Sequence, residues 1–411
     1  MQRPIQALIA VVVLALVSSY GLYSLGGEKT ISAAFGRSPA ISADIPDTPD
    51  EWRGRIDYAN LDRQLAAIAA RPDMAGLAVA VVEGGKLSFV GTYGVADKST
   101  GAPVTPATMF RWASVSKTVT GTLAATLASE GAVDLNRPIS SWRTSLRLPN
   151  GAESQLTFAQ LLSQQTGLTK NAYDEKLEDG QSPIVVRASL AAAPLQCLPG
   201  TCHTYQNVAF DTATEILGQA TNRPFPDTVS ERFFLPLGMK SAAYGMTGLT
   251  GAKDWARPHN GSQVRTLKEA YWRVPAAAGV ESNIVDFARW LRASMGERPD
   301  VIPTSVLQIA QMPRVKTARL YGGALRQANS DTHYGLGWRS FKYGEHALVG
   351  HSGAVDGFRT TLIFEPTTRT GVVAMWNSNG GVPFRIPFAV LDSYHKRPDS
   401  RWLELSDIPA S

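Results

Sequence analysis

The stretch Phe110-Arg111-Trp112-Ala113-Ser114-Val115-Ser116-Lys117-Thr118 carries the strongest signal in the sequence. Ser114 and Lys117 stand three positions apart, and a helix places such residues on the same face. A serine hydroxyl is a weak nucleophile until a base removes its proton, and a lysine can act as that base only where burial or nearby positive charge lowers its pKa. The N–H groups at a helix start also favour an oxyanion. Taken alone, the pattern is better explained by a surface helix with Ser114 as its N-cap, so it needs support from other stretches.

A second polar stretch is Tyr205-Gln206-Asn207, which follows a tight turn predicted at Pro199-Gly200. A phenol beside a lysine ammonium loses its proton more readily and can act as a general base. Asn207 can donate a hydrogen bond to a substrate carbonyl and can orient Lys117. Taken alone, Tyr205 is better explained as a packed tyrosine with a polar tip.

The third stretch is GHSGAVDGF at residues 350–358. Residues 349–353 are typical of a strand edge with small side chains, which could lie against an extended substrate and aim the Ala354 N–H into a site. The competing interpretation is a glycine-rich turn with one exposed histidine, His351.

A different class of enzyme is also conceivable from the same residues, because GHSGA nearly matches the G-x-S-x-G nucleophile elbow of α/β-hydrolases. In that hypothesis Ser352 is the nucleophile and His395 the later histidine. Two features oppose it. Ala354 stands where the last glycine belongs, and residues 355–364 predict turn and strand where the elbow requires a helix.

Together, and in this order, SVSK at Ser114, YQN at Tyr205 and HSG at His351 resemble the serine β-lactamases and penicillin-binding proteins, specifically the class C β-lactamase-like branch. That family runs S-x-x-K, then Y-x-N, then K-T-G or H-x-G. Supporting matches are LTFAQLLSQQTGL at 156–168, LPLGM at 235–239, PAAAG at 275–279 and YGLGW at 334–338. The resemblance covers residues 55–390.

The resemblance implies a serine hydrolase that needs no cofactor. Ser114 would form an acyl-enzyme, and Lys117 and Tyr205 would share proton transfer in acylation and deacylation. The bond cleaved would be an amide or an ester, in a peptidoglycan-type or D-amino-acid peptide, a β-lactam or a small ester. The alternative from another functional class is a penicillin-binding sensor or cell-wall-binding protein that acylates without turnover, although an intact Tyr205 opposes it.

The resemblance also implies the binding residues. Asn207 would bind the substrate amide, and the N–H groups of Ser114 and Ala354 would form the oxyanion hole. His351 and Gly353 would line the site on the sheet edge. Many β-lactamases have lysine where this chain has His351, and an unperturbed histidine is mostly neutral at pH 7, so we expect weak β-lactamase activity at best.

Hydrophobic periodicity predicts an α+β fold, an antiparallel β-sheet flanked by helices with an inserted all-helical subdomain, as in β-lactamases and transpeptidases. The hydrolase domain is predicted over 55–395, with the helical subdomain at 113–270. Predicted strands are 77–82, 87–90, 334–343, 360–365 and 371–377. Predicted helices are 59–70, 114–129, 157–164, 206–220, 226–234, 284–293 and 383–394. The helix at 284–293 is predicted to be capped by Asn283, with Asp286 at the third position of a capping box.

The N-terminus predicts export. Arg3 precedes an uncharged stretch from Pro4 to Gly27, long enough to cross a bilayer. We interpret residues 1–35 as a signal anchor in preference to a cleaved signal peptide, and 36–54 as a linker. Because positive residues beside a membrane span stay in the cytoplasm, Arg3 predicts that the domain lies on the periplasmic side of the cytoplasmic membrane. It would be either anchored there by this helix or secreted.

Composition excludes several other classes. The chain has 411 residues, 44% of them hydrophobic and 18% charged, which is typical of a folded globular protein. Its net charge of +5 is spread along the sequence without a basic tract, so nucleic acid is not an expected partner. In an oxidising compartment Cys197 and Cys202 are expected to form a disulfide. No metal site is predicted, because none of the six histidines has ligand spacing.

Overall fold

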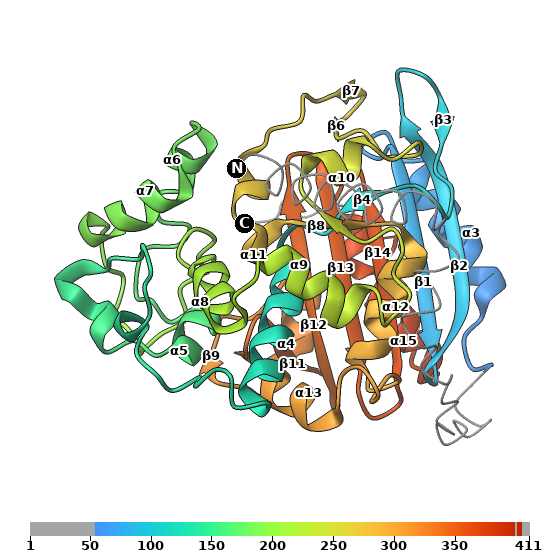
Figure 1. Ribbon diagram of the computed structural model, residues 1–411. Coiled ribbons are helices and arrows are strands. Elements are labelled where there is room, and N and C mark those ends of the chain that lie inside the picture. Colours follow the sequence, from blue (N-terminus) through green and yellow to red (C-terminus); the bar gives the residue numbers. More distant parts are fainter. Residues whose placement is uncertain (1–53, 399–400, 405–411) are drawn as a thin grey trace, which may run out of the picture. The chain divides into compact units, whose positions relative to one another are not determined.

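A nine-stranded antiparallel sheet forms the centre of the computed structural model, which describes residues 54–398 and 401–404 (Figure 1). The strands follow the order β3-β2-β1-β14-β13-β12-β11-β10-β9. Their bounds are β1 Gly76–Glu83, β2 Lys86–Asp97, β3 Ala102–Pro103, β9 Val315–Lys316, β10 Asn329–Tyr334, β11 Arg339–Tyr343, β12 His346–Val355, β13 Phe358–Glu365 and β14 Thr370–Trp376. Strands from both ends of the chain meet where β1 pairs with β14.

Both faces of this sheet are covered by helices. Along β1 alternate side chains point to opposite faces, so Leu77 and Val79 pack with one group of helices while Ala78 and Ala80 pack with another. The first group comprises α3 Tyr58–Ala69 and α15 Ile386–Tyr394, and the second includes α4 Ser116–Ser129 and α12 Ile284–Ser294. Burial on both faces explains why β1 is apolar from Leu77 to Val82.

Several short helices lie between β4 and β8 in the sequence. They are α5 Phe158–Leu162, α6 Asp174–Glu178, α7 Pro183–Ser189, α8 Thr212–Thr221, α9 Phe225–Val229 and the π-helical turn Ser230–Phe234. In Figure 1 α5 to α8 lie to the left of the sheet while α9 lies in front of it. The other short helices are α10 Met246–Thr250, α11 Pro275–Ala278, α13 Thr304–Gln311 and α14 Gly323–Ala328. Two small sheets complete the fold, made of β4 Phe110–Arg111, β5 Ala243–Tyr244 and β8 Val280–Ser282, and of β6 His259–Asn260 and β7 Gln263–Val264.

The predicted α+β class is confirmed, and so are the hairpin of β1 and β2, the helix α3 and the helix α12 with Asn283 as its N-cap. Asp286 does not close a capping box, because its carboxylate accepts hydrogen bonds from Ser241 instead. The predicted limits of 55–395 for the domain and 113–270 for its helical part stay a prediction.

Two predicted elements differ from the structure. The helix predicted over 206–220 begins only at Thr212, because Gln206 is held in a loop by hydrogen bonds with Gln164. The strand predicted over 334–343 is broken after Tyr334 by a turn over 335–338, and only Arg339–Tyr343 continues as β11.

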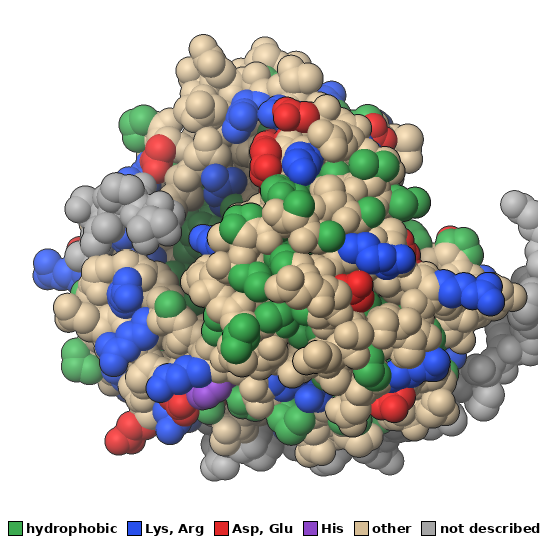
Figure 2. All heavy atoms as spheres, turned by 90° about the vertical axis from the view of Figure 1, so that its left-hand side faces the viewer, with side chains coloured by type: hydrophobic (Ala, Val, Ile, Leu, Met, Phe, Trp, Pro, Cys, Tyr) green, Lys and Arg blue, Asp and Glu red, His purple; other side chains and the backbone are tan. Residues whose placement is uncertain are grey.

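The predicted anchor at 1–35 and all of the linker except Gly54 lie outside the described residues. Among the residues that the structure describes, no helix is both long and apolar enough to cross a bilayer. Figure 2 shows one face of the molecule, on which basic and acidic side chains are interspersed and no continuous basic patch stands out.

Candidate active site

Ser114 lies on a single 3₁₀ turn, Ala113–Val115, at the entry to helix α4. The residue before it, Ala113, has φ +48°, a left-handed conformation that is strained for an alanine. Trp112 fixes the approach to this turn, since its backbone N–H donates to Val280 O (2.8 Å) and its carbonyl accepts from Thr360 Oγ1 (2.7 Å). Neighbouring elements on both sides therefore hold Ser114 at the helix start.

Strand β12 passes directly against this turn at Gly353. A side chain at this position would place its Cβ 2.5 Å from Trp112 O and 2.9 Å from the Ser114 N, so only glycine lets the strand approach so closely. Strand β11 pairs with β12 only as far as Arg339 opposite Gly350. Residues 351–355 thus have no strand partner on that side within the described chain, and Ala354 is exposed there.

Lys117 is completely buried one helical turn after Ser114. Its Nζ donates to Asn207 Oδ1 (2.7 Å) and to the carbonyl of Ala277 (3.0 Å), and it lies 4.7 Å from the centre of the Tyr205 ring. An ammonium has three donors, and the protein contacts found in the described residues occupy two of them. The third donor has no partner among the described residues, and Ser114 lies three residues earlier, on the turn that leads into α4.

Asn207 links Lys117 to a buried carboxylate that the sequence did not suggest. Its Nδ2 donates to Asp174 Oδ2 (2.7 Å), and the hydroxyl of Tyr271 donates to the same oxygen (3.3 Å) and to Glu178 Oε1 (2.7 Å). Asp174 is 6% exposed, and its second oxygen has no hydrogen-bond partner among the described residues. Burial raises the pKa of Asp174 to about 6, and the bond from Asn207 and the charge of Lys117 oppose that rise.

The Tyr205–Asn207 loop is held by a reciprocal pair of glutamines. The backbone N–H of Gln206 donates to Gln164 Oε1 (2.7 Å), and Gln164 Nε2 donates to Gln206 O (3.1 Å). Gln206 Nε2 also donates to Thr169 O (2.7 Å). Both glutamines are fully buried, so these bonds replace water that the chain has excluded. The middle residue of Y-x-N therefore positions the outer two.

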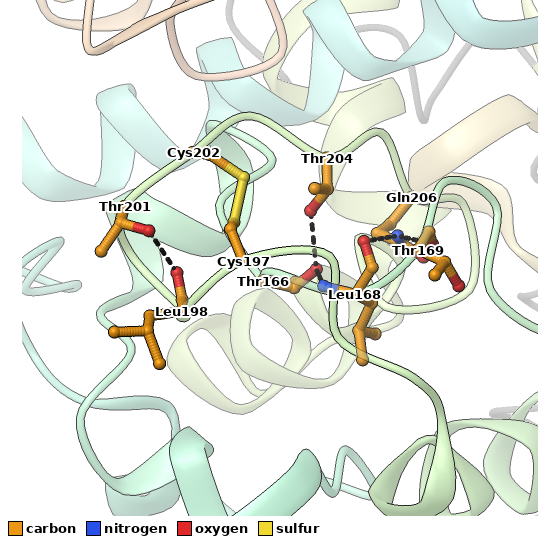
Figure 3. The surroundings of a disulfide bond; sticks show 9 residues. All are labelled: Thr166, Leu168, Thr169, Cys197, Leu198, Thr201, Cys202, Thr204 and Gln206. Carbon is orange, nitrogen blue, oxygen red and sulfur yellow. Dashed lines mark hydrogen bonds between the residues drawn. A yellow bond between two sulfur atoms is a disulfide. The ribbon is translucent and has the colours of Figure 1, made fainter.

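The predicted disulfide between Cys197 and Cys202 is present and closes the loop just before Tyr205 (Figure 3). Thr204 lies beside the 164–169 segment, with its hydroxyl 3.5 Å from Thr166 Oγ1 and its N–H donating to Gln164 O (2.7 Å). The disulfide thus stiffens a turn that delivers Tyr205 to the site.

His351 lies on β12 and is buried, so the alternative of an exposed histidine in a turn is wrong. Its Nδ1 lies 2.7 Å from the carbonyl of Ser352, which can only accept, so Nδ1 carries the proton. The hydroxyl of Tyr334 then donates to Nε2 (2.8 Å). Burial, together with the charges of Arg339 and Lys117, holds the pKa of His351 well below its usual range. The imidazole is therefore neutral, as the sequence predicts. Its neutrality comes from burial and from the neighbouring positive charges rather than from the ordinary pKa of a histidine.

Arg339 supplies a positive charge where the H-x-G motif has none. Its guanidinium carbon lies 5.8 Å from the centre of the Tyr205 ring and 5.0 Å from that of Tyr334. Within the part of the chain that the structure describes, it makes no ion pair or hydrogen bond to another side chain. The same charge and burial lower the pKa of His203 to about 3. Arg339 thus places a permanently charged guanidinium beside this strand edge.

A cavity of about 180 Å³ lies beside the strand edge. Its lining residues are Leu320, Tyr321, Arg339, Phe341, Gly350, His351, Ser352 and Ile363. They include one arginine and no carboxylate. A larger hollow of about 340 Å³ is lined instead by Leu127, Glu130, Ala132, Ala220, Thr221, Arg223, Thr228, Glu231 and Arg232, away from the predicted residues.

The structure brings together the stretches that the motifs predicted. Ser114 contacts β12 at Gly353, Lys117 contacts Asn207 and the Tyr205 ring, and the Tyr205 and His351 ring centres lie 6.3 Å apart. Sequence reasoning missed Asp174, Gln164 and Arg339. None of these three belongs to the S-x-x-K, Y-x-N or H-x-G patterns, although Gln164 lies inside a stretch that supported the resemblance.

The nucleophile-elbow hypothesis is wrong. Ser352 lies inside β12, which turns into strand β13 instead of a helix, and its hydroxyl lies 3.1 Å from Thr361 Oγ1 on that neighbouring strand. His395 follows helix α15 and contacts Glu365 rather than Ser352.

Comparison with known proteins agrees with this geometry. The sequence model of the β-lactamase family matches residues 61–392. Protein flp of Staphylococcus aureus strain MW2 is 24% identical over 310 residues, which are 74% of this chain and 60% of that protein. Unguisins hydrolase ungD of Aspergillus violaceofuscus is 26% identical over 332 residues, 74% of this chain and 58% of that protein. The chain therefore spans about three fifths of the length of these curated relatives.

Solved structures share the fold. The octameric penicillin-binding protein homologue from Pyrococcus abyssi superposes with a TM-score of 0.73 at 20% identity, covering 84% of this chain and 79% of that one. A β-lactamase/D-alanine carboxypeptidase from Pseudomonas syringae gives 0.67 at 21% identity, covering 82% and 98%. With the family model matching most of its length, this chain belongs to the β-lactamase family of serine hydrolases.

Proposed function

We propose that the protein hydrolyses an amide or ester bond through an acyl-enzyme on Ser114. The observation that carries the proposal is Lys117, whose buried ammonium is fixed by two hydrogen bonds and retains one donor beside the start of its own helix. Holding a nucleophile and its proton acceptor in one rigid arrangement is the main requirement for this chemistry.

In the acylation step, the Ser114 oxygen attacks the substrate carbonyl while its proton passes to the deprotonated oxygen of Tyr205, which lies beside the Lys117 ammonium. The N–H groups of Ser114 and Ala354 stabilise the oxyanion that forms, and β12 supplies the second of these because Gly353 brings the strand to the turn. Tyr205 then returns the proton to the leaving amine or alcohol. In deacylation a water molecule attacks the ester, its proton takes the same path, and Ser114 is regenerated.

The charges around the site favour a substrate with an anionic group. Arg339 lines the cavity without a carboxylate partner among the described residues, and His351 is neutral. An arginine that is pre-positioned but unpaired can bind a carboxylate through two parallel hydrogen bonds. We therefore infer that Arg339 takes the place of the lysine of K-T-G as the anion-binding group, with Asn207 binding the substrate amide.

Two features support an extracytoplasmic location. The disulfide Cys197–Cys202 persists only in an oxidising compartment, and the sequence before the domain predicts export. We propose that the protein acts on the periplasmic side of the membrane, where peptidoglycan fragments and D-amino-acid peptides are available as substrates. Membership of the class C-like branch belongs to the same proposal.

The test is a substrate panel of p-nitrophenyl esters, D-alanyl peptides and nitrocefin, assayed with the purified protein and with Ser114→Ala. We expect ester or peptide turnover that Ser114→Ala abolishes, with nitrocefin hydrolysed weakly. Intact-protein mass spectrometry after mixing should show a transient adduct on Ser114. Efficient nitrocefin turnover would refute the proposed specificity, and a permanent adduct without product would favour a penicillin-binding sensor. Turnover retained in Ser114→Ala would refute the mechanism.

A further inference from the structure

Two histidines and a glutamate meet at the end of the sheet opposite the strand edge that carries Gly353. His346 is the first residue of β12, Glu365 is the last residue of β13, and His395 follows helix α15. The three come from separate elements, so their spacing along the sequence gave no indication of a site. The proposed hydrolysis does not use any of them.

The carboxylate of Glu365 lies between the two imidazoles. His346 Nδ1 lies 2.8 Å from Glu365 Oε1, and His395 Nε2 lies 2.7 Å from Oε2. The two rings are stacked with their centres 3.8 Å apart. Three ligand atoms, one from each residue, all lie within 4.8 Å of one another. One nitrogen of each histidine thus lies beside the same carboxylate, close enough for a single ion to join all three residues once the stacked rings turn.

These donors fit a borderline transition-metal ion. Imidazole nitrogen and carboxylate oxygen are the ligands that zinc takes together, at about 2.0–2.2 Å, and a tetrahedral ion separates such ligands by roughly 3.3 Å. Reaching that spacing requires the two rings to turn out of their stacked arrangement. Each histidine must also move its proton from the nitrogen that now faces Glu365 to its other nitrogen, which a neutral imidazole can do without a change of charge.

The surroundings also suit a bound ion. The Glu365 side chain is only 5% exposed, and Thr368 Oγ1 donates to its Oε2 (2.8 Å), which fixes the carboxylate from behind. The side chain of His346 is 28% exposed, so solvent can reach the cluster and supply a fourth ligand. We propose that His346, Glu365 and His395 bind a divalent transition-metal ion, zinc in the first instance, with water completing the coordination.

This site is structural, since it lies on the strand ends and helix α15 rather than beside Ser114. A metal held by three elements binds the folded chain and not the unfolded one, so it raises the unfolding temperature. At free zinc a hundredfold above the dissociation constant, we expect a rise of about 4 °C for a chain of this size. Hydrolytic activity should stay unchanged.

The test uses the full chain, first treated with EDTA and then titrated with Zn²⁺ by calorimetry and thermal unfolding. Co²⁺ serves as the spectroscopic probe, because tetrahedral Co²⁺ with nitrogen and oxygen ligands absorbs in the visible range. We expect one equivalent to bind, with a visible Co²⁺ band. His346→Gln and His395→Gln should each lose the band and the rise in unfolding temperature, and His333→Gln, a histidine on β10 outside the cluster, should keep both.

The unfolding temperature of each variant in EDTA shows whether it folds. His346→Gln is the variant to rely on if His395→Gln fails to fold, because His346 is the more exposed of the two. Absence of the Co²⁺ band in the parent protein would overturn the proposal and leave a hydrogen-bonded triad. Binding that persists in His346→Gln would overturn it as well.

Discussion

Replacing Asp174 with asparagine should stabilise the protein above pH 6 and slow its catalysis. Burial raises the pKa of this carboxyl from 3.8 to about 6 in the folded protein. The folded state therefore binds the proton more tightly than the unfolded state, so stability falls as the pH rises from about 3.8 to about 6 and the cost is constant above that. One pKa unit corresponds to about 1.4 kcal/mol, so the full cost is about 3 kcal/mol at pH 8 and disappears below pH 4.

The introduced asparagine can keep the hydrogen bond from Asn207 through its own carbonyl oxygen, so the substitution removes mainly the charge. We therefore expect the Asp174→Asn variant to gain about 3 kcal/mol over the parent between pH 4 and pH 8, or about 4 °C in unfolding temperature. The loss of the charged acceptor weakens the Asn207–Lys117 connection by about 1 kcal/mol, so kcat should fall about fivefold, with a smaller change in KM.

The assays are thermal unfolding from pH 4 to pH 8 and ester hydrolysis at pH 8. Glu175→Gln is the matched control, because it neutralises an exposed carboxylate on the same helix. The control should change neither the pH dependence of unfolding nor kcat. A stability difference between Asp174→Asn and the parent that stays constant with pH would refute the reasoning about burial, and an unchanged kcat would refute the link to Lys117.

Three further variants, the last with two substitutions, test other parts of the structure. Gly353→Ala places a Cβ 2.5 Å from Trp112 O, so it should push β12 from the Ser114 turn and lower kcat/KM for ester hydrolysis at least a hundredfold; parent-like rates would contradict the role of this contact. Arg339→Gln should raise KM about tenfold for anionic esters and leave neutral esters unchanged, and an equal effect on both would contradict anion binding. Replacing Cys197 and Cys202 with serine should lower the free energy of unfolding by about 2 kcal/mol in urea titrations, an effect that vanishes when the parent is reduced.

The motif residues and the sheet strands could be predicted because each carries a local signal. The spacing of Ser114 and Lys117 predicts that they lie close together at a helix start, and β1 is apolar from Leu77 to Val82 because both faces of the sheet are covered. Asp174 and Arg339 could not be predicted, since ordinary surface helices and strands carry the same residue types. Their importance comes from contacts with residues more than ten positions away, which no periodicity records.

The helix predicted from 206 failed for a related reason. Apolar spacing over 206–220 satisfies a helix, but a helix starting at Gln206 would sacrifice its buried bonds with Gln164. A buried polar group of either glutamine that is left without a hydrogen bond costs about 1–3 kcal/mol. The intrinsic helix propensity of a few added residues stabilises the protein by less than that. The loop that carries Tyr205 and Asn207 is thus stabilised by Gln164 and Gln206, whose side chains favour neither a helix nor a loop in the local sequence pattern.

The position of Lys117 depends finally on two glycines remote from any chemistry. A Cβ on Gly121 would lie 1.6 Å from Leu336 O, and one on Gly337 would lie 2.0 Å from Lys117 O, so helix α4 and the 335–338 turn touch backbone to backbone. Because of that contact, the helix enters the sheet region deeply enough to bury the lysine completely. The same contact explains why the strand predicted over 334–343 is broken. A turn replaces the strand at the place that helix α4 occupies, and the YGLGW stretch therefore acts through packing, with no reactive group of its own in the proposed mechanism.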